Sequence, residues 1–135
     1  MAVSFVKVKR NVTLGSNPGE KFVVRLYRGT DVQLEQIAED IANQTTISFA
    51  DTIAVLKSLE VNISKYVVSG QAVKLGYLGS FIPQISAKAM ETAEEADVSS
   101  IHRFSCRFLP SVEFKRTLKK VKFKQSDFEV KGLVE

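Results

Sequence analysis

Two stretches at the start of the chain have the residue pattern of β-strands. Residues 4–12 and 21–27 are rich in Val and Phe, and a polar loop containing Asn17-Pro18-Gly19-Glu20 joins them. Asn, Pro and Gly favour a tight turn, so these residues predict a β-ribbon. A two-stranded ribbon is only marginally stable alone. We therefore expect it to pack on the rest of the domain or to pair with its sheet.

The pattern changes to the helical period after Thr30. One apolar stripe, with acidic residues on the opposite side, is formed by Leu34, Ile37, Ala38 and Ile41. Thr30 and Gln33 have the spacing of a capping box, so we expect the helix to open at Thr30. Polar residues 43–46 end it, and Ser48 with Asp51 has the spacing of a second box that opens the next helix.

The second helix is apolar on more than one face over about twenty residues. A helix that packs against one small core needs only an apolar stripe, so a second apolar face indicates another partner. The simplest partner is an identical subunit, and a place at the centre of a monomeric core is the alternative. In a homodimer we expect the interface to include Ile53, Leu56, Leu59 and Ile63.

A hairpin pinned by glycines follows this helix. Gly70 suits the left-handed residue at a helix end. Residues 72–75 then alternate at the strand period, Gly76 and Gly79 bracket a tight reversal, and alternation resumes at Phe81. The sequence thus predicts a helix that leads directly into a hairpin.

The next part of the chain predicts an arm and a returning strand. Residues 87–98 lose all periodicity and include four acidic residues, Glu91, Glu94, Glu95 and Asp97. From Ser99 the alternation returns. It predicts two strand faces, one with Phe104, Cys106 and Phe108 and the other with Arg103, Ser105 and Arg107.

A short helix is expected after Pro110, with Ser111 as its cap. Phe114 and Leu118 are expected to point inward. The outward cations of this segment are Lys115, Arg116, Lys119 and Lys120.

The stretch from Gly70 to Phe81 reads G-x-x-V-x-L-G-x-L-G-S-F. It resembles the signature of the HU family, the bacterial histone-like DNA-binding proteins. The order of predicted elements over about residues 30–120 agrees, and the chain resembles the longer HU-like variants that carry an N-terminal β extension. The resemblance implies a division into an N-terminal β extension at 1–29, an HU-like DNA-binding domain at 30–124 and a C-terminal tail at 125–135.

The same resemblance implies an α+β, HU-like fold. Its parts are two N-terminal helices, a three-stranded antiparallel sheet with a β arm, a short C-terminal helix and an N-terminal β ribbon, assembled as an intertwined homodimer. Family members hold DNA on a saddle formed by their sheets, and two β arms reach into the minor groove. By resemblance, the cations that would contact DNA phosphates are Lys74, Arg103, Arg107, Lys115, Arg116, Lys119 and Lys120.

The arm departs from the family pattern. HU arms are typically basic and carry an Arg-Asn-Pro tip whose proline wedges between base pairs. This chain has no such tripeptide there, and its four acidic arm residues would repel phosphate.

Charge along the 135 residues is strongly segregated, although the net charge is only +4. Residues 1–30 carry six Lys or Arg against one acid, and residues 99–124 carry eight against one, whereas residues 31–60 carry six acids against one Lys. Such segregation favours an anionic partner for one surface, with a merely solvated face as the alternative. The ribbon cations either extend a DNA-binding surface or guard an exposed strand edge.

Other chemistry finds little support in the sequence. The single cysteine, Cys106, excludes an internal disulfide and suits a reducing cytoplasm. His102 is expected on the same strand face as Cys106, but one Cys and one His supply neither a zinc site nor a catalytic triad. The N-terminus does not have the pattern of a signal peptide, and no apolar run approaches the length needed to span a bilayer. We therefore expect no enzyme activity, cofactor, metal, small-molecule substrate or membrane partner.

The sequence predicts a homodimer that binds double-stranded DNA with little sequence preference, as a nucleoid-associated architectural protein of the cytoplasm. The alternative is an HU-like structural or protein-interaction module with weak or no DNA binding, in which the acidic arm serves a protein partner.

Overall fold

The computed structural model describes residues 2–126, which divide into two compact units. One unit combines residues 2–31 with residues 117–126, and the other spans residues 32–116. The described chain is α+β, with three α-helices and two three-stranded sheets, and this architecture is compatible with an HU-like fold. The predicted boundaries at residues 29 and 124 stay a prediction.

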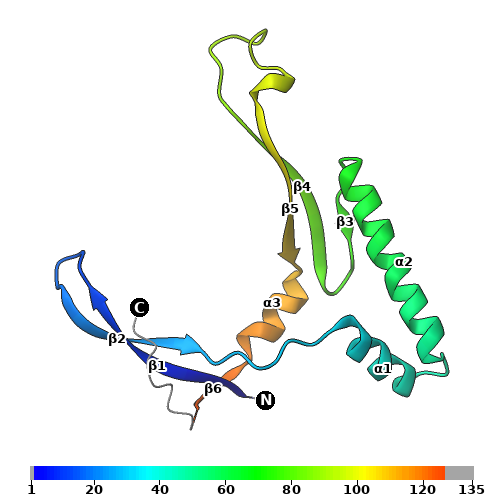
Figure 1. Ribbon diagram of the computed structural model, residues 1–135, viewed down its shortest axis with the longest axis horizontal. Helices are drawn as coiled ribbons and strands as arrows, with labels where there is room; N and C mark the ends of the chain where they lie inside the picture. Colours follow the sequence, from blue (N-terminus) through cyan, green and yellow to red (C-terminus); the bar gives the residue numbers. More distant parts are fainter. Residues whose placement is uncertain (1, 127–135) are drawn as a thin grey trace. The chain divides into compact units, whose positions relative to one another are not determined.

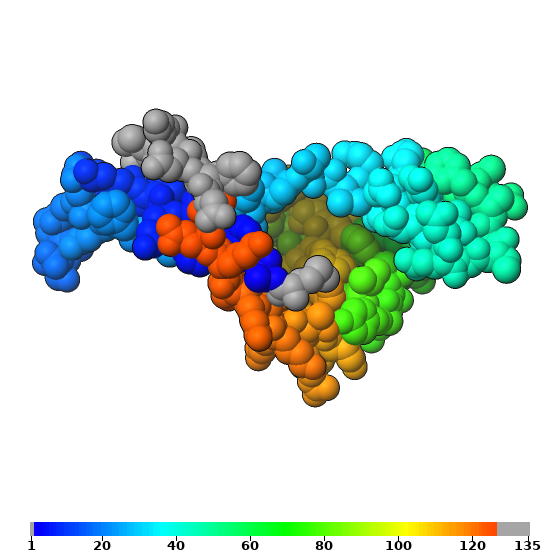
Figure 2. Space-filling model, turned by 90° about the horizontal axis from the view of Figure 1, so that it is seen from below, coloured from blue at the N-terminus to red at the C-terminus, as the bar shows by residue number. Residues whose placement is uncertain are grey.

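The first unit is a small sheet built from both ends of the described chain. β1 (Ala2–Val12) and β2 (Gly19–Leu26) pair antiparallel, which confirms the predicted ribbon. β6 (Lys122–Gln125) pairs parallel with β1, so the strand order is β2-β1-β6. Figure 2 shows β6 in orange-red against β1 in dark blue. The sequence pattern did not predict this third strand, because its partner lies about 120 residues away along the chain.

The second unit contains the helices and the other sheet (Figure 1). Its elements in chain order are α1 (Leu34–Gln44), α2 (Phe49–Val68), β3 (Val73–Lys74), β4 (Gly79–Ala87), the 3₁₀ turn η1 (Val98–Ser100), β5 (Ile101–Pro110) and the start of α3 (Val112–Lys119). The three strands are antiparallel in the order β3-β4-β5, and α2 packs against α1, β3 and β4. The long β4–β5 hairpin extends well beyond β3, as the predicted arm requires.

Helix α1 begins later than its capping signal predicted. The helix starts at Leu34, and Gln33 is its extended N-cap residue without a side-chain capping bond, so the box at Thr30 is wrong. Before the helix, the β1–β2 ladder continues as far as Tyr27, whose N donates to Ser4 O at 2.9 Å. Val32 remains 66% exposed, so the face whose burial stabilises the helix begins only at Leu34.

Helix α2 has the ends that the sequence predicted. Asp51 N donates to Ser48 Oγ at 3.2 Å, which confirms Ser48 as the cap. At the other end Gly70 adopts φ +86°, in the left-handed region that glycine tolerates best. Gly70 N and Gln71 N bond the carbonyls of Val67 and Tyr66 at 2.9 and 3.0 Å, and these bonds turn the chain directly into β3.

Gly79 fixes the corner at which β4 meets the end of β5. It lies opposite Pro110 with φ +142°. A Cβ there would overlap the backbone oxygen of Leu109 and lie 2.9 Å from Pro110 Cα. Ser111 secures the same corner, since its amide donates to Leu78 O at 3.1 Å and its hydroxyl to Tyr77 O. Only glycine therefore lets the strands pair up to the first residue of β4.

Gly79→Ala is expected to lower the free energy of unfolding by about 2–4 kcal/mol, because it adds a backbone overlap to left-handed strain. Gly76→Ala is the control: φ there is +55° with open space around the missing Cβ, so only strain of about 1 kcal/mol is expected. Urea unfolding at one protein concentration measures both variants. Equal losses would contradict the close approach at Gly79.

Candidate nucleic-acid interface

One face of the β3-β4-β5 sheet is apolar and lies toward α2. Phe81 is opposite Phe108, and Pro83 is opposite Cys106; residues paired in this way share one face of a sheet. The Phe81 and Phe108 rings are 5.3 Å apart between centroids. Together with α2 residues, Phe81 and Cys106 line a groove of about 380 Å³. The structure thus confirms that Phe104, Cys106 and Phe108 share one face.

The other face carries three of the predicted DNA contacts. Lys74 is opposite Ser80, Arg107 is opposite Ile82, and Arg103 is opposite Ser86, so all three cations leave the sheet on the side away from α2. All three are exposed, and Arg103 and Arg107 stand about 13 Å apart along β5, at roughly 3.3 Å per residue. The strand residues on this face include no Asp or Glu. Lys74, Arg103 and Arg107 are therefore brought together on an acid-free surface, which we call the outer sheet face.

Helix α3 presents the other predicted cations. Ser111 caps it as predicted, because Phe114 N donates to Ser111 Oγ at 3.0 Å. Phe114 is half-buried and meets the Tyr77 ring edge-on at 6.1 Å. Leu118 is 52% exposed, so its predicted burial is wrong within this chain. At 3.6 residues per turn, four exposed cations lie on one side of the helix and at its C-terminal end; they are Lys115, Arg116, Lys119 and Lys120.

The seven predicted contacts do not all belong to one unit. Lys115 and Arg116 belong with the outer sheet face, whereas Lys119 and Lys120 belong with the β2-β1-β6 sheet. No local pattern in the sequence indicated this division. Lys119 and Lys120 precede β6, and the pairing of β6 with β1 can be recognised only in the folded structure.

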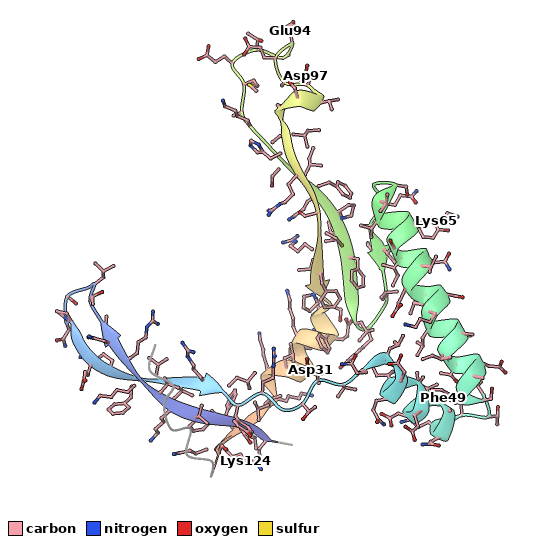
Figure 3. The ribbon with its side chains drawn as sticks, viewed as in Figure 1. Asp31, Phe49, Lys65, Glu94, Asp97 and Lys124 are labelled. Carbon is pink, nitrogen blue, oxygen red and sulfur yellow. The ribbon has the colours of Figure 1, made fainter. Side chains whose placement is uncertain are left out.

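The end of the β4–β5 hairpin is acidic, as predicted. Figure 3 shows Glu94 and Asp97 at the end of the hairpin remote from α2. Asp97 caps η1 by accepting hydrogen bonds from Ser99 N at 2.9 Å and from Ser99 Oγ. Two hydrogen bonds from Ser99 lower the pKa of Asp97 below its ordinary value, the one from the side chain more than the one from the backbone. This carboxylate therefore stays charged at neutral pH, at the place where HU arms carry cations.

Helix α2 has an apolar edge that the described chain leaves open. Of the predicted dimer residues, Ile53, Leu56 and Ile63 are half-buried, and Leu59 is 43% exposed. Val55 and Tyr66, exposed by 64% and 48%, lie beside Leu59 at helical spacing. The helical spacing of Val55, Leu59 and Tyr66 was a sequence signal for this edge. The predicted interface residues included Leu59 but not Val55 or Tyr66.

Candidate chemistry beyond binding is sparse in the described chain. Among residues 2–126, no group of three His, Cys, Asp or Glu side chains could hold a metal ion. His102 lies at an irregularity of the ladder, since Ser86 pairs with Arg103 and Ala87 pairs with Ile101. No helix within residues 2–126 is both long and apolar enough to cross a membrane.

Comparisons with known proteins agree with this architecture. A family model described as "HU domain fused to wHTH, Ig, or Glycine-rich motif" matches residues 1–125. A crystal structure from Bacteroides vulgatus ATCC 8482, of a protein described as a candidate bacterial DNA-binding protein, matches with a TM-score of 0.60 and 13% sequence identity. The match covers 96% of this chain and 49% of that chain, so this chain spans about half the length of that protein. At this identity the similarity concerns the fold alone.

A search among curated proteins gives no match. HU domains are architectural modules and not enzymes. Because the family model covers nearly the whole chain, the protein belongs to the HU family whose HU domain is fused to wHTH, Ig or glycine-rich motifs.

Proposed function

We propose that the protein is a homodimer that binds duplex DNA with little sequence preference, as a nucleoid-associated architectural protein of the cytoplasm. The observation that carries this proposal is the outer sheet face, where Lys74, Arg103 and Arg107 stand exposed without a neighbouring acid on the strands. Membership of the HU family supports DNA as the anionic partner.

The chemistry of this face suits phosphate rather than bases. Lys and Arg bound to phosphates displace condensed counterions, which provides affinity that depends on salt but not on sequence. The rest of the face is formed by short polar side chains together with Ile82 and Leu109. In the proposal these residues lie under the duplex, and the basic side of α3 contacts its flank.

The homodimer is supported by the small apolar core of the 32–116 unit. Within its residues only Ala38 and Val67 are buried apolar side chains. Val55, Leu59 and Tyr66 are exposed along one edge of α2, beside the groove that Ile63 and Phe81 line. Contiguous apolar surface of this kind marks an interaction site, and a second copy related by a two-fold axis would cover it.

A protein-interaction module is the second candidate, and the acidic arm favours it. Glu91, Glu94 and Glu95 are exposed, and Asp97 is held in its charged form. Such a surface would repel phosphate, so in the proposal for DNA binding the arm provides no phosphate contacts.

The proposal predicts an obligate dimer at micromolar concentration by analytical ultracentrifugation. Ile63→Glu is expected to lower the free energy of unfolding by more than about 3 kcal/mol, because it places an unpaired charge in the interface. Leu59→Glu is expected to act in the same direction. Ala54→Glu is the control and should remain a folded dimer, because Ala54 is exposed and lies nine residues from Ile63, on the opposite side of α2. A folded wild-type monomer would contradict this prediction.

The proposal also predicts steep salt dependence of duplex binding. For about four to eight phosphate contacts per dimer, log affinity should fall with log salt at a slope of about −4 to −7. The double variant Arg103→Ala, Arg107→Ala is expected to make the slope shallower by roughly 1 for each phosphate that an arginine no longer neutralises. It should weaken binding to duplexes of different sequence by the same factor.

Lys57→Ala with Lys65→Ala is the matched control, because it removes two exposed cations from α2 and none from the outer sheet face. Titrations monitored by fluorescence anisotropy at several salt concentrations measure both variants. If the wild type does not bind duplex DNA at low salt, the result would favour the protein-interaction module instead.

A further inference from the structure

The positive charge of this protein is concentrated in the small sheet unit rather than in the unit that carries the helices and the arm. In the sequence, residues 1–31 and 117–135 contain eleven Lys or Arg against five acids, whereas residues 32–116 contain eight against ten. The unit that resembles the HU core is therefore slightly acidic. The unit built around β1 has an excess of six positive charges.

Within residues 2–126, the two acids of the small sheet unit lie beside Lys9 and Arg28. Glu20 contacts Lys9, with Nζ and Oε2 2.8 Å apart, and Asp31 lies 4.0 Å from Arg28. Seven further exposed cations of this unit make no ion pair within residues 2–126; they are Lys7, Arg10, Lys21, Lys119, Lys120, Lys122 and Lys124.

Four of these cations share one face of the β2-β1-β6 sheet. Arg10 is directly opposite Lys21, and Lys122 and Lys124 on β6 are opposite Ala2 and Ser4. These positions all belong to the face of β1 that also carries Val6 and Val8, and the strand residues of this face include no acid. Val6 and Val8, at the middle of the face, are buried, so the exposed cations form two groups, Arg10 with Lys21 at one end and Lys122 with Lys124 at the other. Along β1 the distance from Ala2 to Arg10 is about 26 Å, at roughly 3.3 Å per residue. Lys124 is labelled in Figure 3.

This arrangement costs stability in the free protein. Like charges directly opposite each other on paired strands are destabilising, and Arg10 with Lys21 is such a pair. Protection of a sheet edge against pairing with other chains is the competing explanation. Edge protection needs charge but not one sign of charge, and a mixture of Lys and Glu would provide it without repulsion. A surface with only positive charge is instead suited to a polyanion.

We propose that these two groups of cations on the β2-β1-β6 sheet form a second site that binds DNA phosphates. The proposal rests on the proposed function and deepens it. The acidic arm cannot supply a second set of phosphate contacts, and the small sheet supplies them in its place. The recognised chemistry is the phosphate backbone, so this site adds affinity and salt dependence without adding sequence preference.

The test compares two triple variants of the full chain that lose the same charge by the same substitution. The first is Lys21→Gln, Lys122→Gln and Lys124→Gln, on the small sheet. The control is Lys57→Gln, Lys65→Gln and Lys88→Gln, which are exposed in the other unit and lie outside the outer sheet face. Duplex affinity is measured against salt for both and for the wild type.

The sheet variant is expected to bind at least about tenfold more weakly at 0.1 M salt, with a slope shallower by roughly 1 for each lysine that contacts a phosphate. The control variant should keep the wild-type slope and bind within about twofold of the wild type. Without DNA, the melting temperature of the sheet variant should equal or exceed that of the wild type, because Lys21→Gln removes the repulsion from Arg10.

Two results separate the inference from the function on which it rests. If the wild type binds duplex and both triple variants behave alike, the inference is overturned and the proposed function stands. If the sheet variant alone loses binding while the Arg103→Ala, Arg107→Ala variant retains it, the inference stands and the outer sheet face is not the main contact. A wild type that does not bind duplex at low salt overturns both.

Discussion

The architecture of the 32–116 unit depends on one close backbone approach, at Gly79. With no Cβ at this position, the first residue of β4 can lie against the Leu109–Pro110 backbone, so the β4–β5 ladder starts without an offset. That register decides which side chains of β5 face α2 and which leave the outer sheet face. Ser111 at the same corner begins α3. One corner therefore sets the position of the sheet cations and of the first cations of the helix.

The two faces that this register creates differ in chemistry. On the side of α2 the apolar residues of the sheet and helix line a groove, which a second copy covers in the proposed homodimer. On the other side the cations stand without acids. The arm ends in carboxylates instead of the basic tip of its relatives, and the surplus of positive charge lies in the sheet formed by β1, β2 and β6. A common fold thus carries its charge in an unusual place.

Much of the fold and part of the candidate site could be read from local signals. The Ser48 cap and the left-handed Gly70 bound α2 as predicted, and the alternation through Phe104 and Arg107 assigned each to its sheet face. These predictions succeeded because a cap, a left-handed glycine and a strand period depend on neighbouring residues alone. The capping box at Thr30 failed, since packing of the apolar face decides where this helix begins, and Val32 before Leu34 is exposed.

By itself, the sequence determined the family, the order of the elements from β1 to α3 and the sets of cations. Only the tertiary structure decided how those cations are divided. The pairing of β6 with β1 joins residues about 120 positions apart, and it unites the basic N-terminal ribbon with the lysines that follow α3. No local pattern specifies such a partner, because a parallel strand pair depends on backbone groups that meet only when the chain has folded.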